Sequence, residues 1–208
     1  MARTNKNFNN KKAELSSQIF NLFLKNGYEN TSLATIINSL NISKGSFYHY
    51  FESKENCLDY AINKYISDNI IYLNNILLEK THCNAEEKFH LLLTQGLNKH
   101  TEAETYLENI HTPSNTILHQ KLLIQKTKKF APIFSEIIIQ GINEGSFKTN
   151  YPLEVAETIL SISNFLLNID LFHWNEDEFK TRIKVLEDTI TLLLHAKPNT
   201  FSYITNFN

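Results

Sequence analysis

The spacing of apolar residues is the feature that most constrains the fold of this 208-residue chain. Apolar side chains recur at steps of three and four along nearly the whole length, and no alternating run leads into an Asn-Gly or Asp-Gly turn. Steps of three and four are typical of amphipathic helices, whereas half-buried strands need a step of two. The sequence therefore predicts an all-α protein.

The N-terminal part of the chain contains three short helical segments followed by a long one. Gly27 follows the first segment, where a left-handed residue would end a helix, and Thr31 and Ser53 are the expected N-caps of the second and fourth. Helices this short are not stable alone, so we expect the first three to pack on each other and on the start of the fourth. The four predicted helices cover residues 11–26, 32–40, 44–51 and 54–80.

The rest of the chain continues the helical pattern. Pro132 lies inside a long segment, where its missing backbone donor is expected to kink or split the helix near Phe130. Pro152 stands where proline favours a helix start, and the tail from Pro198 is expected to be loose. The predicted helices cover residues 85–99, 104–111, 114–143, 152–174 and 176–196.

Cysteine usage and hydropathy exclude several classes of protein. Cys57 and Cys83 form no Cys-x-x-Cys pair, and two thiols alone build neither a disulfide framework nor a thiolate zinc site. The first ten residues are polar, and the most apolar stretch, residues 158–169, is short and interrupted by Ser and Asn. Signal peptides and membrane spans need longer apolar segments. We expect a cytoplasmic protein without either.

A three-residue turn, residues 41–43, joins the second and third predicted helices, which is the arrangement of a helix-turn-helix. Asn41 is the best candidate there for a left-handed backbone, because its short amide side chain tolerates a positive φ. On the next helix, Phe47 and Phe51 lie four residues apart and are expected to face inward. The residues left facing outward supply hydrogen-bond donors, a positive charge and a glycine whose backbone is not covered by a side chain. Such groups can approach DNA phosphates and base edges closely. They are Lys44, Gly45, Ser46, Tyr48 and His49, and Tyr50 is left unassigned.

This segment resembles the N-terminal domain of the TetR/AcrR family of bacterial transcriptional regulators. The resemblance covers about 45 residues with fixed internal spacing. It is carried by Leu22-Phe23, Gly27-Tyr28, Thr31-Ser32, Ile36, the run from Ile42 to Phe51, Ser53-Lys54-Glu55 and Leu58. The sequence differs from the family pattern at Asn41, where glycine is usual, and at Leu40, where alanine is usual. The larger Leu40 side chain is expected to tilt the two helices relative to one another.

The resemblance implies a homodimer that binds a pseudo-palindromic operator in double-stranded DNA, and a C-terminal domain that binds a small-molecule effector. The helix of residues 44–50 would enter the major groove, and repression is the family's usual mode of regulation. We expect a DNA-binding domain over residues 1–55 and an effector-binding and dimerisation domain over residues 56–208. The implied DNA contacts are Lys44, Gly45 and Ser46 to bases, and Ser32, Tyr48, His49 and Lys54 to phosphates.

Charge is distributed unevenly between these two segments. Residues 1–55 carry seven basic and four acidic side chains, a net charge of +3, whereas residues 56–208 carry a net charge of −5. A basic end on an acidic body favours a polyanionic partner at that end. The basic residues near the N-terminus either follow the DNA backbone, enter a minor groove, or belong to a tail that contacts nothing. They are Arg3, Lys6, Lys11 and Lys12.

The C-terminal segment offers candidates for an effector pocket and a dimer interface. A kink at Pro132 would separate helices that carry interleaved aromatic and histidine residues. The effector candidates are Phe89, His90, Tyr106, His111, Phe130, Phe134, Phe165 and His173. The last two helices carry apolar stripes that either pack within their own subunit or form a four-helix interface with a second copy. The stripe residues are Leu153, Ala156, Leu160, Ser163, Leu167, Phe179, Ile183, Leu186, Ile190 and Leu193, and Val185, Leu192 and Leu194 extend the apolar surface.

Two Glu-x-x-His pairs, Glu87–His90 and Glu108–His111, point to an alternative function. A di-iron carboxylate bundle, in an oxidase or an iron-storage protein, uses two such pairs together with two more glutamates. The two pairs are only 21 residues apart, and the further inward glutamates are not evident. The C-terminal segment otherwise contains no series of nucleophile, base and orienting residue that spacing alone identifies, no Gly-rich phosphate loop and no metal signature of high specificity. We therefore expect no enzymatic activity, no cofactor and no metal.

Overall fold

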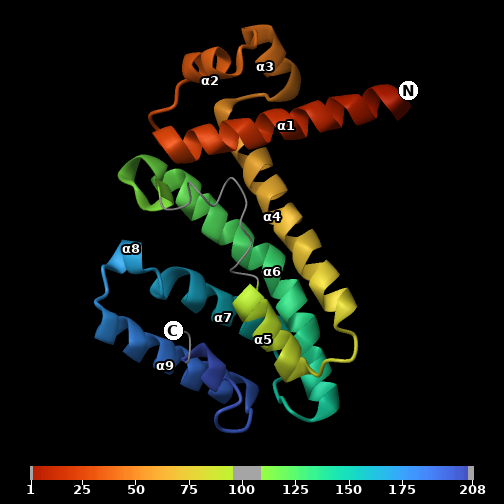
Figure 1. Cartoon of the computed structure of the whole chain (residues 1–208), viewed down its shortest axis with the longest axis vertical. Coiled ribbons are helices and arrows are strands. Elements are labelled where there is room, and N and C mark those ends of the chain that lie inside the picture. Colours follow the sequence, from red (N-terminus) through yellow and green to blue (C-terminus); the bar gives the residue numbers. More distant parts are fainter. Residues whose placement is uncertain (1, 96–108, 206–208) are drawn as a thin grey trace. The chain divides into compact units, whose positions relative to one another are not determined.

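The structure, a computed structural model, describes residues 2–95 and 109–205, with side chains described for residues 7–93, 109–168 and 171–205. Every element in these ranges is helical, which confirms the all-α prediction (Figure 1). None of the described helices has the length and apolar content needed to cross a membrane. The α-helices are α1 (Ala2–Asn26), α2 (Leu33–Leu40), α3 (Lys44–Tyr50), α4 (Lys54–Glu79), α5 (Ala85–Gln95), α6 (Thr116–Glu144), α7 (Pro152–Ser161), α8 (Ile169–Phe172) and α9 (Glu176–Leu194).

The described residues form two compact units. The first unit contains residues 2–68 and 109–125, and the second contains residues 69–95 and 126–205. Each unit therefore combines segments that are distant in sequence. The boundary expected at residue 55 separates domains by function and stays a prediction.

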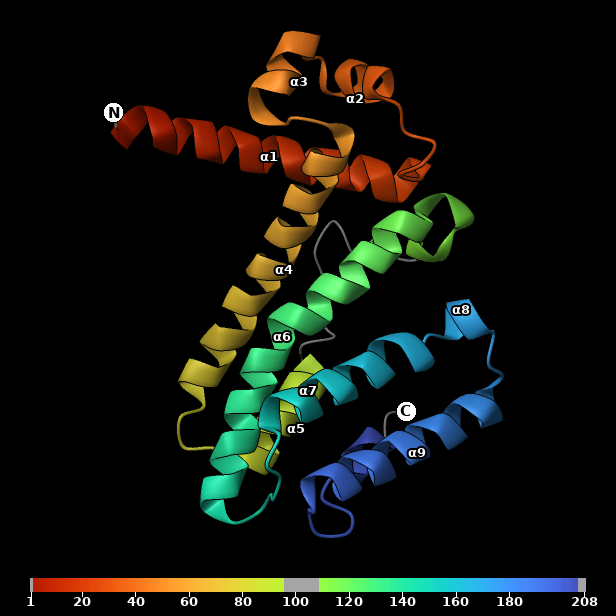
Figure 2. The same ribbon diagram turned by 180° about the vertical axis from the view of Figure 1, so that it is seen from behind.

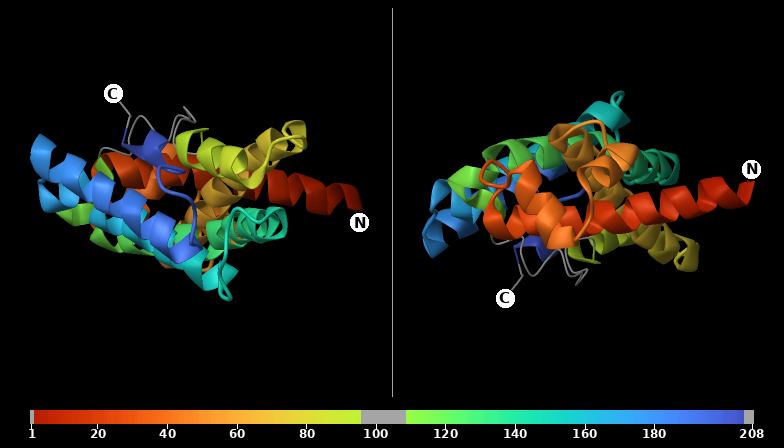
Figure 3. Two further views of the ribbon diagram at one scale, coloured as in Figure 1. Left: turned by 90° about the horizontal axis from the view of Figure 1, so that it is seen from below. Right: turned by 90° about the horizontal axis from the view of Figure 1, so that it is seen from above.

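The first unit is built around α1. Helices α2 and α3 lie on the same side of α1 (Figure 2) and stand in front of it in the view from above (Figure 3). Leu15, Ile19 and Phe23 recur along α1 at steps of four and are buried, so a single apolar stripe of this helix supplies much of the core. The other buried apolar residues of this unit are Phe20, Leu24, Tyr28, Ile36, Phe47, Phe51, Cys57, Leu58, Ala61, Ile62, Ile66, Ile110, Leu118 and Leu122.

Helix α1 begins at Ala2, nine residues earlier than the spacing of apolar residues predicts. The added segment is rich in asparagine, which has a low helix propensity. Phe8 gives this segment a tertiary contact, because its ring stacks on Tyr50 of α3 at a centroid distance of 5.0 Å. A contact with α3, which the local pattern does not contain, therefore extends the helix.

The start of α2 corrects one predicted cap. Thr31 is buried, and its hydroxyl donates a hydrogen bond to the Gly27 carbonyl oxygen at 2.6 Å, so this side chain does not cap α2. Ser32 caps the helix instead, because its hydroxyl accepts from the Thr35 backbone nitrogen at 3.0 Å. The other two terminal predictions are confirmed: Gly27 has a φ of +88°, and Ser53 accepts from the backbone nitrogen of Asn56.

Four phenylalanines from distant segments form the centre of the second unit. Phe89 of α5 lies 5.4 Å from Phe134 of α6 and 5.3 Å from Phe201, measured between ring centroids, and Phe147 contacts the same group. Phe201 is fully buried and is followed by the short helical turn η4 (Ser202–Ile204). The prediction of a loose tail from Pro198 is therefore wrong, because burial of this ring orders the segment.

Helix α6 runs unbroken from Thr116 to Glu144 through Pro132. The predicted split near Phe130 is wrong. Proline removes only one helical hydrogen bond, and Pro132 and Lys128, whose carbonyl loses its partner, are both exposed to solvent. The neighbouring Ala131, Ile133 and Phe134 are buried and hold the helix to the core on both sides of the missing bond.

The single helix predicted over residues 152–174 is also wrong. Helix α7 ends at Ser161 and is followed by the π-helical turn η3 (Ile162–Leu166) and the short α8. The hydroxyls of Thr158, Ser161 and Ser163 donate to backbone carbonyl oxygens four residues earlier, a pattern that tends to bend helices. Helix α9 matches the predicted last helix closely and begins with a capping box formed by Asn175 and Glu178.

Candidate nucleic-acid interface

The connection between α2 and α3 has the geometry of a tight helix-turn-helix. Asn41 adopts the predicted left-handed conformation, with φ 50° and ψ 46°. Its backbone nitrogen donates to the Asn38 carbonyl oxygen, and that of Ile42 donates to the Ile37 carbonyl oxygen. Ser43 then caps α3 by accepting from the Ser46 backbone nitrogen at 3.0 Å. The turn residues therefore both end α2 and begin α3.

Two aromatic rings hold α3 against the rest of the first unit. Phe47 and Phe51 are both fully buried, as predicted, with their ring centroids 5.5 Å apart. Truncation of a buried phenylalanine typically costs about 3–5 kcal/mol, so this pair fixes which face of the short helix points outward. Tyr50, which the sequence left unassigned, is half-buried against Phe8.

The outward face of α3 contains the residues predicted to face DNA. Lys44, Gly45 and His49 are exposed, and Tyr48 keeps 49% of its surface accessible while its ring edge packs on Phe47. Ser46 is half-buried. Ser32 is exposed at the start of α2. Five of the seven predicted DNA contacts therefore lie on α3. A sixth, Ser32, lies at the start of the preceding helix, α2.

Gly45 has no structural need to be glycine within this chain. Its φ is not in the left-handed region, and a Cβ added to it would meet only the Ser43 hydroxyl, at an ordinary distance of 3.8 Å. Glycine inside a helix is typically less favourable than alanine by about 0.5–1 kcal/mol. A residue that costs stability and that the fold does not need is typical of a surface closely approached by a partner.

Lys54, the seventh predicted contact, does not present a free ammonium beside the others. Its Nζ donates to the carbonyl oxygens of Tyr28 at 2.8 Å and Thr31 at 3.1 Å, and it lies 4.2 Å from the centroid of the Tyr28 ring. Burial lowers the pKa of this ammonium, and the nearby carboxylate of Glu29 opposes that shift. The expected phosphate clamp is therefore corrected: Lys54 ties the start of α4 to the loop that precedes α2.

The C-terminal end of α1 is joined to residues 109–121, a contact that sequence reasoning missed. The Asn115 side chain is fully buried, accepts from the Tyr28 backbone nitrogen at 2.7 Å and donates to the Asn109 carbonyl oxygen at 2.9 Å. Gly27 lies so close to Ser114 that a Cβ on it would meet the serine hydroxyl at 2.2 Å. No local pattern marks an asparagine for such a role, because its partner Tyr28 lies 87 residues away in the sequence.

Lys121 of α6 forms a second link within the same unit. Its ammonium donates to Glu55 at 2.9 Å and to Asp59 at 2.8 Å, both on α4. These hydrogen bonds raise the pKa of Lys121, and the hydrogen bond from Lys121 lowers the pKa of Glu55. The start of α6 is therefore tied to α4, the helix that follows α3.

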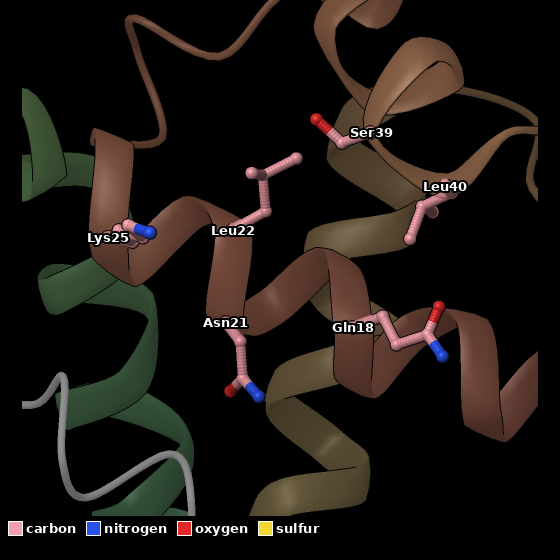
Figure 4. Close-up of a pocket in the computed structure, with 6 residues that line it drawn as sticks. All are labelled: Gln18, Asn21, Leu22, Lys25, Ser39 and Leu40. Atoms are coloured by element: carbon pink, nitrogen blue, oxygen red, sulfur yellow. The ribbon is translucent and has the colours of Figure 1, made fainter.

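A shallow groove lies between α1 and α2 on the surface of the first unit (Figure 4). Leu22 and Leu40 form its apolar part, so the residue that departs from the family pattern lines this surface. Its polar rim consists of Gln18, Asn21, Lys25 and Ser39. The groove is open to solvent and contains no group suited to catalysis.

The residues predicted to contact an effector do not gather at one place. Phe89 and Phe134 belong to the closed core of the second unit, and Phe130 packs against it. His90 is exposed and stacks on Tyr203, and Phe165 and His173 are exposed on the second unit. His111 belongs to the first unit and contacts His119, whereas Tyr106 lies outside the described residues.

The stripes predicted to form a dimer interface divide between core and surface. Ala156, Leu160, Leu186 and Ile190 are buried within their own unit, so this part of the prediction is corrected. Ser163, Leu167, Phe179, Ile183 and Leu193 are half-buried, and Leu153 is exposed. The apolar residues left outside on the same helices are Val185, 55% exposed, and Leu192, 73% exposed, together with Phe165 in the turn after α7.

The Glu-x-x-His pairs have a simpler explanation than a di-iron site. Glu87 accepts from the Asn84 backbone nitrogen while its own backbone nitrogen donates to the Asn84 side chain, which is a capping box at the start of α5. His90 and His111 belong to different units, and Glu108 lies outside the described residues. Among the described residues no group of His, Cys, Asp and Glu is arranged to hold a metal ion.

Comparison with known families gives two matches. Residues 17–61 match the bacterial regulatory proteins of the tetR family, and residues 99–189 match the tetracyclin repressor-like C-terminal domain. The first match spans the helix-turn-helix, and the second covers much of the remaining chain. Both matches agree with the resemblance carried by the N-terminal residues.

Individual relatives extend the similarity over most of the chain. The uncharacterized HTH-type transcriptional regulator YfiR of Bacillus subtilis is 22% identical over 88% of this chain and 90% of its own length. The HTH-type transcriptional repressor KstR2 of Rhodococcus jostii is 22% identical over 70% of this chain and 72% of its own. The crystal structure of reduced E. coli NemR has the same fold, with a TM-score of 0.60 and 17% identity over 90% of this chain and 98% of that one.

Proposed function

The chain belongs to the TetR/AcrR family of transcriptional regulators, and we propose that it is a repressor that binds a pseudo-palindromic operator as a homodimer and is released by a small-molecule effector. The observation that carries this proposal is the outward face of α3, which the buried rings of Phe47 and Phe51 hold in place. On this face Gly45, which the fold does not require to be glycine, lies between the hydrogen-bond donors Lys44 and Ser46 at the start of the helix. The chain acts by binding rather than by catalysis, in the cytoplasm.

In this proposal α3 enters the major groove and Lys44, Gly45 and Ser46 discriminate between bases. Lysine and hydroxyl side chains can donate to acceptors on base edges, and a bare backbone position allows close approach. Ser32, Tyr48 and His49 contact phosphates on either side, which contributes a salt-sensitive and sequence-independent part of the affinity. Lys54 supports these contacts indirectly by fixing the loop before α2.

The proposed homodimer holds two copies of α3 about one turn of DNA apart, roughly 34–36 Å. A pair of apolar helices from each subunit can form a four-helix interface. The exposed Val185 and Leu192 on α9, and Leu153 and Phe165 around α7, are the residues that support this interface. They replace the buried stripe residues as the proposed contacts.

The proposed effector releases DNA by favouring a conformation in which the two recognition helices are wrongly spaced. It must bind that conformation more tightly, because equal affinity for both conformations shifts no population. The bonds of Asn115 and Lys121 support the first unit as the place where this change is transmitted, since they tie the end of α1 and the start of α4 to residues 109–121. The accessible candidates His90 and His173 are proposed effector contacts ahead of the fully packed Phe89 and Phe134.

Selection of DNA by the full chain tests the proposal. Randomised duplexes and fragments flanking the chain's own gene are captured by tagged protein, and the enriched sequences are measured by fluorescence anisotropy. We expect an inverted repeat whose half-sites are about 10 base pairs apart, or a multiple of that spacing, bound by a dimer. Enrichment of unrelated sequences, or a bound species with one subunit, would contradict the proposed function.

A further inference from the structure

The N-terminal extension of α1 is attached to the recognition helix by aromatic contacts. The Phe8 ring stacks on Tyr50 at 5.0 Å with an angle of 28° between the planes, and it meets the ring of His49 edge-on at 5.2 Å. His49 and Tyr50 lie 4.9 Å from each other, so the three rings form one cluster. Phe8 therefore contacts a residue proposed to bind phosphate and the residue next to it.

Lys12, one turn after Phe8, adds a second contact between the two elements. Its ammonium lies 5.4 Å from the centroid of the Phe51 ring and 4.6 Å from that of Tyr60. Phe51 ends α3 and Tyr60 belongs to α4, so this cation–π contact fixes the same part of α1. The extension is thus held at two successive turns beside the C-terminal end of the recognition helix.

The charge of this extension matches a polyanion. The first 13 residues contain Arg3, Lys6, Lys11 and Lys12 and no acidic residue, and Glu14 is the first carboxylate in the sequence. The N-terminal family match begins at residue 17, so these residues precede the part of the domain that this family match covers. Lys11 pairs with the Glu14 carboxylate at 2.8 Å and Lys12 lies over the Phe51 and Tyr60 rings, so the inference rests on the charges of Arg3 and Lys6. A helical segment that bears these charges beside α3 is suited to DNA beyond the bases that α3 reads.

We propose that the extension of α1, residues 2–12, is a further DNA-contacting element that binds phosphates outside the half-site, and that Phe8 is the positioning residue that holds it beside α3. This inference rests on the proposed function. Residues 2–8 span about 9 Å along a helix, and B-DNA carries one phosphate charge per about 1.7 Å of its axis, so several phosphates lie within that length. The extension adds affinity without adding sequence preference, because phosphate contacts carry no base information.

The test measures how the affinity of the full chain for its selected operator depends on salt between about 50 and 200 mM. One variant replaces Arg3→Gln and Lys6→Gln together, and its matched control replaces Lys128→Gln and Lys129→Gln, two exposed lysines of α6. A second variant is Phe8→Ala, with Phe8→Tyr as the aromatic rescue. Circular dichroism and thermal melting check that every variant folds like the wild type.

We expect the Arg3→Gln/Lys6→Gln variant to lower the slope of log affinity against log salt by about one to two, while the α6 control keeps the wild-type slope. Phe8→Ala should lower the slope similarly and leave the ranking of half-site variants unchanged, and Phe8→Tyr should restore it. A wild-type slope in the Arg3→Gln/Lys6→Gln variant would overturn the role of the extension. A wild-type slope in Phe8→Ala would overturn the role of Phe8. A wild-type chain that selects no DNA would instead overturn the proposed function, and this inference with it.

Discussion

The side-chain oxygen of Asn115 accepts a hydrogen bond from the backbone nitrogen of Tyr28 at 2.7 Å, although 87 residues separate the two in sequence. This bond lies at the end of the same helix whose other end packs on the recognition helix. Tyr28 is the second residue beyond the end of α1, so its backbone nitrogen has no partner within the helix, and a buried donor without a partner is costly. Asn115 therefore satisfies a group that α1 alone leaves unpaired.

Replacement of Asn115 by alanine should destabilise the protein by about 1–3 kcal/mol, because the buried Tyr28 nitrogen loses its acceptor. Urea unfolding followed by circular dichroism measures the loss. Asn74→Ala, at an exposed position of α4, is the matched control and should change stability by less than about 0.5 kcal/mol. Equal midpoints for the two variants would contradict the importance of the Asn115 bond.

Gly45→Ala should separate folding from DNA binding. We expect the variant to unfold at the same temperature as the wild type or slightly higher, since alanine favours the helix by about 0.5–1 kcal/mol and the added Cβ meets no close neighbour. Its affinity for the selected operator should fall at least about tenfold, because the Cβ occupies space next to the bases, and a loss of 1.4 kcal/mol corresponds to this factor. Thermal melting and anisotropy on the same preparation measure both effects. An unchanged affinity would remove Gly45 from the proposed interface.

Lys54→Met should weaken the first unit without removing a phosphate contact. The variant loses both hydrogen bonds to the carbonyl oxygens of Tyr28 and Thr31, which typically costs about 1–3 kcal/mol for a charged donor. DNA affinity should fall, but the slope of log affinity against log salt should stay that of the wild type. A slope lowered by about 0.9 would show that Lys54 does contact a phosphate.

The link between Lys121 and α4 predicts a dependence of stability on pH. The folded state lowers the pKa of Glu55 below its usual value. The contribution of this link to the free energy of unfolding is therefore present above pH 4.5 and is lost as pH falls through the folded-state pKa. The folded state raises the pKa of Lys121 above 10.5, so the contribution is present below pH 10.5 and is lost as pH rises through that raised pKa.

Lys121→Gln should therefore be less stable than the wild type near neutral pH, and the difference should shrink below pH 4.5. Added salt should also reduce the difference, because the carboxylates of Glu55 and Asp59 are exposed to solvent. Chemical unfolding at a series of pH values measures this. A difference that grows in acid would contradict the assigned cause.

Leu192→Glu should disrupt the proposed dimer and leave the fold of the subunit intact. Leu192 is 73% exposed on α9, so a carboxylate there stays hydrated in a monomer but is buried in an interface. Sedimentation at micromolar concentration should show a monomer for this variant. Leu78→Glu is the control, because Leu78 is similarly exposed at 71% on α4, and this variant should remain dimeric. A dimeric Leu192→Glu variant would place the interface elsewhere.

Features that depend on near neighbours in the chain were predictable. The left-handed Asn41, the cap at Ser53 and the inward pair Phe47 and Phe51 follow from residue type and from spacings of four or less. One wrong prediction concerns two neighbouring residues that could each serve as the N-cap of α2. Both Thr31 and Ser32 can cap a helix, and only the buried hydrogen bond of Thr31 to Gly27 decides between them.

The candidate site was predictable in its residue types but not in the partners of its charged groups. The sequence placed Lys54 next to the recognition helix, and the structure gives its ammonium two carbonyl acceptors from a loop more than 20 residues earlier. The spacing of apolar residues also predicted an apolar stripe on α9. Because Val185 and Leu192 make other parts of the helix surface apolar as well, the spacing alone did not decide which face is buried within the subunit. Packing within the unit settled that Leu186 and Ile190 face inward and Val185 and Leu192 outward.

The sequence by itself determined the helical class, the helix-turn-helix and the residues exposed on α3, because these follow from backbone preferences and from side chains within one or two helical turns. Only the tertiary structure decided that Phe8 packs on His49 and Tyr50, that Asn115 bonds to Tyr28 and that Phe201 orders the tail. Each of these contacts joins residues dozens of positions apart. Their free energy depends on a geometry that exists only once the helices have packed, and no local pattern in the chain encodes it.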